Sequence, residues 1–316
     1  MKKKYYITTP IYYPSAKPHM GHAYSSISTD FIARYRRLEG FDVEFVTGTD
    51  EHGQKIQKSA KKKNLPPLDF CNKISKVFLD LGKVLNLSNT DFIRTTENRH
   101  YKTVQKLWKI LEEKKFIYLS KYSGWYSISD EAFYSESEII DKENIKLCEA
   151  TGSIVEWVEE ESYFFKLSEF QDILIKHYED NPDFIQPASR RNEVISFVKD
   201  GLKDLSISRN SFKWGIPVPN SKDHIIYVWL DALANYLTAS NYDEENSFWP
   251  ADVHVIGKDI LRFHAVYWPA FLFAANIPLP KKIFAHGWIL SGDEKMSKSK
   301  GNILDPIEII EQFGLD

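Results

Sequence analysis

Short apolar stretches alternate with amphipathic helical patterns at both ends of this 316-residue chain, and the alternation narrows the possible folds more than any other feature. Residues 5–13 have the composition of a buried strand, and apolar residues then recur every three or four positions from Tyr24 to Leu38, until Gly40 ends the helix. The same pattern predicts strands over residues 43–47 and 92–94 and helices over 68–85 and 101–111. Because strands that alternate with helices pair in parallel through right-handed crossovers, we expect a Rossmann-like α/β fold.

The pattern changes between about residues 116 and 223, where short aromatic strands are expected over 122–127, 133–134 and 163–167. A capping box from Ser168 to Gln171 predicts one helix start in this stretch, and Pro187 precedes another helix. From His224 the alternation resumes, with strands over 225–229, 253–256 and 283–286 and helices over 231–239 and 259–275, the second kinked at Pro269. We therefore expect a parallel sheet split by an inserted α+β connective domain over 116–223. Residues 1–115 and 224–290 form the two catalytic halves, and residues 291–316 form a loop and the start of a helical region.

Composition excludes several classes of protein. The length exceeds what one hydrophobic core usually serves, which agrees with a main domain plus an insertion. The net charge of −3 does not favour DNA binding, and no apolar run approaches the ~20 residues that cross a bilayer, so neither DNA nor a membrane is an expected partner. Two cysteines, Cys71 and Cys148, are too few for a disulfide framework, which favours a cytoplasmic location. The GxGxxG and GxxxxGKS/T phosphate-binding motifs do not occur.

The segment His19-Met20-Gly21-His22 lies where the first predicted strand leads into the first predicted helix. A helix N-terminus offers unpaired amide donors and the positive end of a dipole, so anions bind there. Two histidines three residues apart project from one side of the turn, and Gly21 lets a flat ring approach the backbone. This arrangement favours ATP phosphates with adenine against the glycine. The alternatives are a chance pairing of two of the nine histidines, or a metal site.

A second segment, Lys295-Met296-Ser297-Lys298-Ser299, lies near the other end of the chain between Gly292 and Gly301. Taken alone, a loop of lysines and serines is usually a solvated turn. Flanking glycines allow such a loop to close, and its two lysines would bring compact positive charges to phosphate oxygens.

In this order, at opposite ends of a split nucleotide-binding fold, the two segments resemble the HIGH and KMSKS signatures of class I aminoacyl-tRNA synthetases. Further blocks narrow the resemblance to the methionyl-tRNA synthetase family along essentially the whole chain. These blocks are Thr8-Thr9-Pro10-Ile11-Tyr12-Tyr13, Gly48-Thr49-Asp50-Glu51-His52-Gly53, Tyr227-Val228-Trp229-Leu230-Asp231-Ala232 and Gly257-Lys258-Asp259-Ile260 with Phe263-His264.

The resemblance implies roles for individual residues. Asp50 matches the aspartate that holds the amino acid's ammonium group, although an Asp here is also a common helix cap. The methionine pocket of the family maps onto Ile11, Tyr13, Trp229, Ala232, Leu233, Tyr236, Ile260 and His264, which suit a polarizable thioether. The ATP side maps onto Gly21, Gly257, Asp259, Ile289 and Leu290, with His19, His22, Lys295 and Lys298 on the triphosphate. Asp259 as a simple helix cap is an equally good interpretation.

The implied reaction is that of a methionine-tRNA ligase. The carboxylate of L-methionine attacks the α-phosphorus of ATP to form methionyl-adenylate, and tRNA(Met) then takes the acyl group. Because the attacking oxygen is already charged, catalysis requires alignment and neutralisation of the phosphates rather than a protein nucleophile. Mg²⁺ is expected to accompany ATP, held by phosphate oxygens and water.

Two departures from the family pattern lead to further expectations. Ser127 and Asp130 stand where a zinc knuckle would carry a cysteine pair, and Cys148 is followed by Thr151 at the matching spacing, so no structural zinc is expected. Asp305-Pro306 with Glu308 predicts the start of a helix, where the family continues into an anticodon-binding domain. We expect a catalytic core without that domain, able to activate methionine and poor at charging tRNA.

Other functions compete with this interpretation. A class I synthetase for leucine, isoleucine or valine would have a much larger insertion, and one for cysteine would need zinc thiolates. Small nucleotidyltransferases share the histidine signature but lack the insertion. A non-catalytic tRNA-binding relative is disfavoured by the intact signatures.

Overall fold

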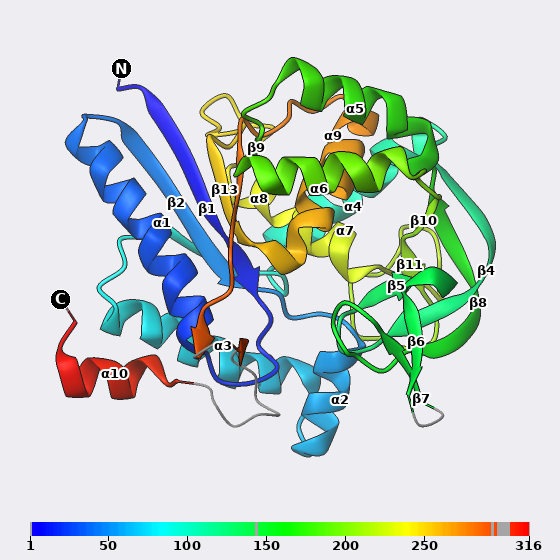
Figure 1. The fold of residues 1–316 in the computed structure, drawn as a ribbon, viewed down its shortest axis with the longest axis horizontal. Helices are drawn as coiled ribbons and strands as arrows, with labels where there is room; N and C mark the ends of the chain where they lie inside the picture. The colour runs from blue at the N-terminus through cyan, green and yellow to red at the C-terminus, as the bar shows by residue number, and fades with distance from the viewer. Residues whose placement is uncertain (1, 143–144, 292–293, 296–303, 316) are drawn as a thin grey trace.

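A computed structural model describes residues 2–142, 145–291, 294–295 and 304–315. Its centre is a six-stranded sheet in the order β3-β2-β1-β13-β14-β9, in which each neighbouring pair is parallel (Figure 1). The strands are β1 (Lys4–Tyr12), β2 (Asp42–Thr49), β3 (Asp91–Arg94), β9 (Ile185–Gln186), β13 (Val253–Gly257) and β14 (Ile283–His286). The predicted Rossmann-like α/β architecture is confirmed. Successive strands spread outward from β1 on one side and from β13 on the other, so the order reverses between these two strands.

The first half supplies four helices: α1 (Met20–Leu38), α2 (Gln54–Lys62), α3 (Pro67–Val84) and α4 (Asn98–Glu113). The apolar periodicity located α1 correctly, but its large residues face outward. Phe31 is 72% and Leu38 88% exposed, whereas small or polar residues such as Ala23, Thr29 and Ala33 are buried. The reason is close packing, because only short side chains fit between α1 and strands β1 and β2.

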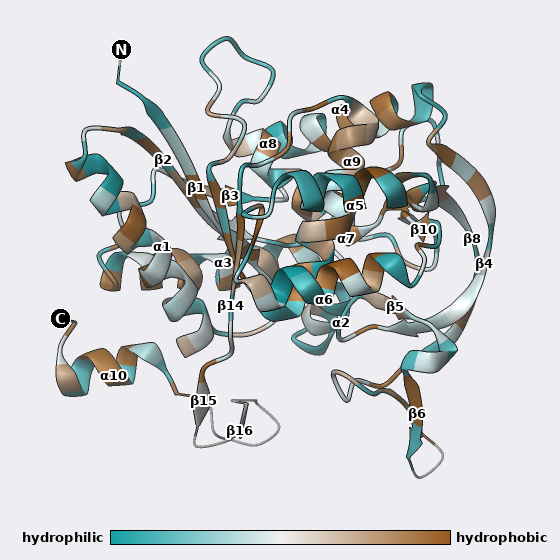
Figure 2. Ribbon diagram, turned by 45° about the horizontal axis from the view of Figure 1, so that its top comes forward, coloured by the Kyte–Doolittle hydropathy of each residue, from teal (hydrophilic) through white to brown (hydrophobic). Residues whose placement is uncertain are grey.

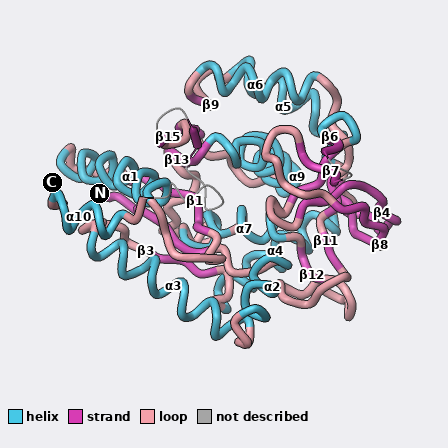
Figure 3. The backbone as a smooth tube through the Cα atoms, turned by 60° about the horizontal axis from the view of Figure 1, so that its bottom comes forward, coloured by secondary structure: helices cyan, strands magenta, loops and turns pink. Residues whose placement is uncertain are grey.

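The insertion forms a four-stranded antiparallel sheet in the order β10-β8-β4-β5, a small β6–β7 hairpin and two helices. Its elements are β4 (Ile117–Ser127), β5 (Ala132–Tyr134), β6 (Ile139–Lys142), β7 (Ile145–Cys148), β8 (Glu156–Phe165), α5 (Gln171–Asp180), α6 (Ala188–Lys199) and β10 (Leu205–Ser206). In Figure 3, β4 and β8 lie on the side of the molecule opposite α1. The domain boundaries at 115/116 and 223/224 stay a prediction, and β9, from within this stretch, joins the main sheet.

The predicted capping box is wrong. Ser168 lies inside a 3₁₀ turn, Leu167–Phe170, and its hydroxyl donates to Asp204 at 2.5 Å. The side chain of Gln171 accepts a hydrogen bond from the amide of Leu202 at 2.9 Å instead of turning back to a cap. Tertiary partners therefore replaced the local pairing that the sequence pattern favoured.

The strand predicted over 225–229 is only partly present. β12 (Ile225–Ile226) pairs with β11 (Ser208–Arg209) outside the main sheet, and helix α7 (Val228–Leu233) begins at once, followed by α8 (Asn235–Ala239). The helix predicted over 259–275 is a 3₁₀ turn, Lys258–Ile260, a π-helical turn, Phe263–Tyr267, and α9 (Trp268–Ala275). The π-helical turn ends at Tyr267, two residues before Pro269, and the carbonyl of Ala265, four residues before the proline, accepts from the Tyr178 hydroxyl at 2.6 Å. The irregularity therefore lies next to the proline, and the predicted kink itself stays a prediction.

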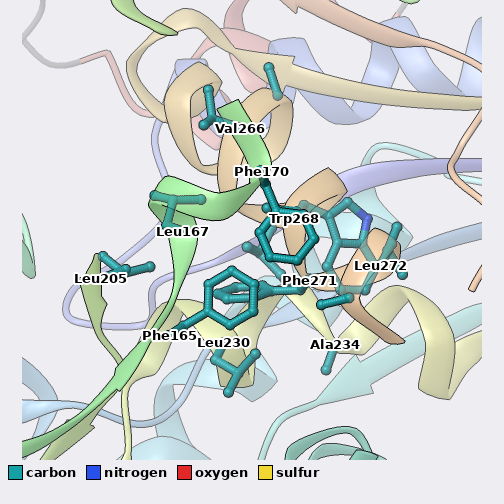
Figure 4. Packing of buried hydrophobic residues seen from close by; sticks show 14 of the residues in the cluster. Phe165, Leu167, Phe170, Leu205, Leu230, Ala234, Val266, Trp268, Phe271 and Leu272 are labelled. Atoms are coloured by element: carbon teal, nitrogen blue, oxygen red, sulfur yellow. The ribbon is translucent and has the colours of Figure 1, made fainter. Parts of the chain in front are cut away.

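One large core joins the insertion to the catalytic halves. Phe165 and Leu167 of the insertion pack in the same cluster as Leu230, Trp268 and Phe271 from the second half (Figure 4). Beyond β14 the described chain forms β15 (Leu290–Ser291), β16 (Glu294–Lys295) and α10 (Pro306–Phe313). The predicted helix start is confirmed, since Asp305 caps α10 by accepting from the Ile307 amide at 2.9 Å. Hydrophobic residues are visible along α10 and α1 in Figure 2. Within the described ranges, every helix is too short or too polar to cross a bilayer.

Candidate functional site

A cavity of about 600 Å³ opens at the carboxyl edge of the sheet, where β1 and β13 lead into their helices. This is the reversal point of the strand order, the usual ligand site in open α/β sheets. Most of the residues proposed from the sequence line it, namely Ile11, Tyr13, His19, Gly21, His22, Asp50, Trp229, Ala232, Leu233, Tyr236, Gly257, Asp259, Ile260, His264 and Ile289. Leu290 and Lys295 belong to β15 and β16, whose side chains are not described, and Lys298 lies outside the described residues.

The two histidines of the first signature cap the start of α1 reciprocally. Nδ1 of His19 accepts from the Gly21 amide at 3.1 Å, and Nδ1 of His22 accepts from the His19 amide at 3.0 Å. In a neutral imidazole the other ring nitrogen then carries the hydrogen, so Nε2 of each ring is a donor. A Cβ at position 21 would lie 2.9 Å from Cε1 of His19, which explains the glycine. The start of α1 thus combines imidazole donors with the positive end of the helix dipole.

The chain on both sides of the second signature lies against this helix start. Before it, Trp288 and Ile289 line the same cavity as His19, and Nε2 of His286 is 2.7 Å from the Ser25 hydroxyl of α1. After it, the carbonyl of Leu304 accepts from the Met20 amide at 3.3 Å. Segments from opposite ends of the sequence therefore converge on one side of the cavity.

Asp50 follows β2 directly and is 7% exposed at the cavity wall. Burial, reinforced by the negative charges of Asp231 and Glu131, raises the pKa of its carboxyl well above the usual range. Among the residues that the structure describes, its Oδ1 has no hydrogen-bond donor. A desolvated carboxylate with an open oxygen is a strong site for a cationic group, because the cation would relieve both the burial and the repulsion.

Asp231, two residues beyond Trp229, contrasts with Asp50. Its Oδ2 lies 2.6 Å from Nδ1 of His52 and its Oδ1 lies 2.7 Å from Nε2 of His100. Despite complete burial, the two histidines hold the pKa of Asp231 below its usual range. Through these two contacts Asp231, in α7, links the segment after β2 to helix α4. In the sequence, His52 and Asp231 stand out only as members of family blocks, and no pattern links them to His100.

At the apolar end, Tyr236 and His264 form a buried pair whose hydroxyl and Nε2 are 2.7 Å apart. Nδ1 of His264 lies 3.0 Å from the Ile260 carbonyl, which can only accept, so Nδ1 carries the hydrogen and Tyr236 donates to Nε2. Burial lowers the pKa of His264 to about 4, which keeps it neutral near pH 7. His264 sits in the π-helical turn, a device that often marks functional sites.

Trp229 and Asp259 complete the wall. Trp229 stacks on Phe263 with ring centroids 3.6 Å apart, and its Nε1 is buried without a hydrogen-bond partner within the described part of the chain. The cap of the turn after β13 is Gly257 rather than Asp259, and Asp259 is an exposed member of the lining. The interpretation of Asp259 as a simple N-cap is therefore wrong.

The turn that resembles a zinc knuckle is held by hydrogen bonds to Asp130. Its Oδ2 accepts from Thr151 at 2.7 Å and from Tyr134 at 2.8 Å, and its Oδ1 accepts from Ser153 at 2.7 Å. Structural zinc requires thiolates or imidazoles, so one buried cysteine, Cys148, beside hydroxyl groups does not fit it. Over the described ranges no three His, Cys, Asp or Glu side chains gather as a metal site.

A parallel sheet whose reversal point holds a histidine-capped helix start beside a buried open carboxylate has the Rossmann-like architecture of the class I synthetases. The comparison with family models agrees. The chain belongs to the family described as tRNA synthetases class I (M), whose model matches residues 5–316.

Curated relatives include the methionine–tRNA ligases of Rickettsia conorii, 58% identical over 100% of this chain, and Rhizobium meliloti, 56% identical over 99%. The chain spans 62% and 61% of their lengths. A solved structure of Mycobacterium tuberculosis methionyl-tRNA synthetase in complex with methionyl-adenylate matches with a TM-score of 0.97 and 52% identity, covering 99% of this chain and 62% of that one. The free-state structure from the same organism matches with a TM-score of 0.84 and 48% identity, covering 100% of this chain and 60% of that one.

Proposed function

We propose that this chain is the catalytic region of a methionine-tRNA ligase, which activates L-methionine with ATP and transfers it to tRNA(Met). The observation that carries the proposal is a single cavity joining the histidine-capped start of α1 to the open carboxylate of Asp50 and the Tyr236–His264 pair. The names of the relatives support the amino acid and the adenylate.

At the amino-acid end, Asp50 binds the ammonium group of methionine. The thioether lies against Ile11, Tyr13, Trp229, Ala232, Leu233, Tyr236, Ile260 and His264. Because the Tyr236 hydrogen is donated to His264, this pair offers the sulfur a polarizable, closely shaped surface rather than a strong donor. A shorter or branched side chain would leave the pocket underfilled or clash with it.

At the nucleotide end, His19, His22, Lys295 and Lys298 contact the triphosphate, and Gly21, Gly257, Asp259, Ile289 and Leu290 surround the adenosine. Mg²⁺ enters with ATP as part of the substrate, because the groups at the start of α1 are imidazoles and amides rather than the oxygen ligands that Mg²⁺ prefers.

In the first step a methionine carboxylate oxygen forms a bond to the α-phosphorus, the bond to the bridging oxygen breaks, and pyrophosphate leaves. In the second step a hydroxyl of the terminal tRNA ribose attacks the acyl carbon, loses its proton, and AMP leaves. The protein aligns the reactants and compensates the charge that develops on the phosphates.

We also propose that the insertion folds without zinc, since the Asp130 hydrogen bonds occupy the knuckle turn. Elemental analysis of purified protein should find zinc far below one atom per chain, and one equivalent would overturn this view.

Methionine-dependent exchange of labelled pyrophosphate into ATP tests the proposed function. We expect exchange that depends on methionine and is not supported by leucine, isoleucine, valine or cysteine. Exchange with one of these instead would assign another class I synthetase, and no exchange with any amino acid would indicate a non-catalytic relative. Charging of tRNA(Met), compared with a full-length relative, tests the second step.

A further inference from the structure

Glu131 is a residue of the insertion that lines the cavity and hydrogen-bonds to other parts of its wall. It lies in the turn between β4 and β5 with a φ of 50°, is 5% exposed, and lines the cavity beside Asp50. Few residues other than glycine adopt a positive φ, and a buried carboxylate is costly unless it is well partnered. Both observations indicate that neighbouring parts of the molecule hold Glu131 in place.

Its partners come from four separate parts of the chain. Oε1 accepts from the Tyr13 hydroxyl at 3.2 Å and from the Lys55 amide at 3.0 Å, Oε2 accepts from the Tyr126 hydroxyl, and its carbonyl accepts from the Tyr227 hydroxyl at 2.5 Å. Lys55 is the second residue of α2, and the helix has no side-chain cap of its own because its N-cap is Gly53. Glu131 therefore caps α2 from the inserted domain.

Gly53, Tyr13 and Glu131 are closely packed where the insertion meets the start of α2. Gly53 has a φ of 101°, and a Cβ there would lie 2.6 Å from the Tyr13 hydroxyl and 2.8 Å from Oε1 of Glu131. The Tyr13 hydroxyl also lies 2.7 Å from the His52 carbonyl, so it bridges Glu131 to the segment that carries Asp50. A displacement of the Glu131 carboxylate would therefore move Tyr13 and Gly53, which lie on either side of it near Asp50.

We propose that Glu131 is a positioning residue for the amino-acid end of the cavity, coupling the insertion to the corner formed by Tyr13, Asp50 and Gly53. This inference rests on the proposed function. Glu131 acts in two ways: its reach sets the position of Tyr13 and the first turn of α2, and its charge adds to the field that attracts the ammonium group. The insertion then contributes directly to methionine binding.

Three variants distinguish the effect of the side-chain length of Glu131 from the effect of its negative charge. Glu131→Gln keeps an oxygen for Tyr13 and Lys55 and offers an amide hydrogen to Tyr126, so it removes mainly the charge. Glu131→Asp keeps the charge and shortens the reach, and Glu131→Ala removes both. Glu156→Gln removes an exposed charge from β8, opposite Tyr126, and is the matched control.

Pyrophosphate exchange by the wild-type protein first establishes that methionine is the substrate, so failure of the proposed function is seen before any variant is tested. For Glu131→Ala, which loses both reach and charge, we expect the KM for methionine to rise about tenfold, the effect of one lost charged hydrogen bond, with the KM for ATP within twofold. For Glu131→Asp, which keeps the charge, we expect a smaller rise in the KM for methionine. In Glu131→Gln the side-chain oxygen can still accept from the Tyr13 hydroxyl and the Lys55 amide. The KM for methionine of this variant should therefore stay within about threefold of the wild-type value at alkaline pH.

The pH profile gives a second readout that a purely structural role would not move. Asp50 must be ionised to bind ammonium, so kcat/KM for methionine falls as pH drops through its raised pKa. Loss of the Glu131 charge lowers that pKa, so the acid limb in Glu131→Gln should shift to lower pH and stay in place in Glu131→Asp. The other titratable groups that face Asp50 are Asp231, Glu51, Tyr13 and Cys71, which all variants keep.

Equal rises of both KM values in Glu131→Ala, or an unshifted acid limb in Glu131→Gln, would overturn the proposal. If Glu131→Ala does not fold, the Gln and Asp variants still decide it. In a further test, Tyr13→Phe and Glu131→Ala should be non-additive, because the alanine variant acts through Tyr13. Full additivity would contradict the coupling.

Discussion

The two ends of the cavity are built in different ways. The proposed amino-acid end has buried lining side chains whose hydrogen-bond partners are set by the fold, as in Tyr236 with His264, and behind the lining Asp231 pairs with His52 and His100. The nucleotide end consists of a helix start, two half-buried histidines and chain that arrives from the far end of the sequence. A preorganised apolar end suits selection of one amino acid, whereas an open end with donors suits a charged group that must enter, react and leave.

The largest effect should come from the nucleotide end. Lys298→Ala should slow adenylate formation about 10²–10³-fold, as loss of a well-placed donor does at other charged transition states. Methionine affinity should change less than twofold, because the two ends are separate. Pyrophosphate exchange and methionine titration by tryptophan fluorescence measure the two quantities. Unchanged exchange would refute the role of Lys298, and Lys109→Ala on α4 is the control.

At the amino-acid end, Asp50→Asn should raise the KM for methionine roughly 10- to 150-fold, the equivalent of ~1.5–3 kcal/mol for a charged hydrogen bond. Because burial raises the pKa of Asp50 in the folded state, stability falls as pH rises from the ordinary pKa of an aspartate towards the raised one, and the loss is complete above the raised pKa. The Asn variant should therefore melt at a higher temperature near pH 8, and methionine should no longer raise its Tm. A lower Tm with unchanged methionine binding would contradict both statements.

The histidine cap can be separated from its proposed contact with phosphate. In His19→Asn the side-chain oxygen can still accept from the Gly21 amide, so the Tm should stay within about two degrees, since Asn is a good N-cap. Adenylate formation should slow about tenfold through loss of the imidazole donor. Equal rates of adenylate formation in His19→Asn and wild type would mean that His19 only caps the helix. His19→Ala removes the cap as well, so both its Tm and its rate of adenylate formation should fall.

The smallest effect is expected at the buried pair. Tyr236→Phe leaves Nε2 of His264 without its donor, which should lower the free energy of unfolding by about 1–2 kcal/mol and raise the KM for methionine several-fold. Urea unfolding and pyrophosphate exchange measure these changes, with Tyr35→Phe on the exposed face of α1 as the control. A change in the KM for ATP of the same size would argue that the two ends are not independent.

Much of the fold could be inferred before the structure because its signals are local. The 3.6-residue period located α1, and Asp305-Pro306 located the start of α10. The errors arose where distant groups compete with local preference. Ser168 donates to Asp204 instead of capping a helix, and the buried face of α1 is the small-residue face because the sheet approaches closely. Periodicity finds a helix but cannot tell which of its faces has a neighbour.

The features of the site also fall into those that local sequence patterns predict and those that depend on distant contacts. The signature segments and the family are evident from the chain itself, because each rests on contiguous patterns of residue types. The proposed pocket side chains followed only from the resemblance to that family. The raised pKa of Asp50, the pairing of Asp231 with two histidines and the cap that Glu131 provides to α2 are visible only in the fold. The hydrogen bonds of Asp231 and Glu131 join residues 76 to 179 positions apart, and the raised pKa of Asp50 depends on burial and on the charge of Asp231, which is 181 positions away. Burial and such distant contacts are created only when the chain packs.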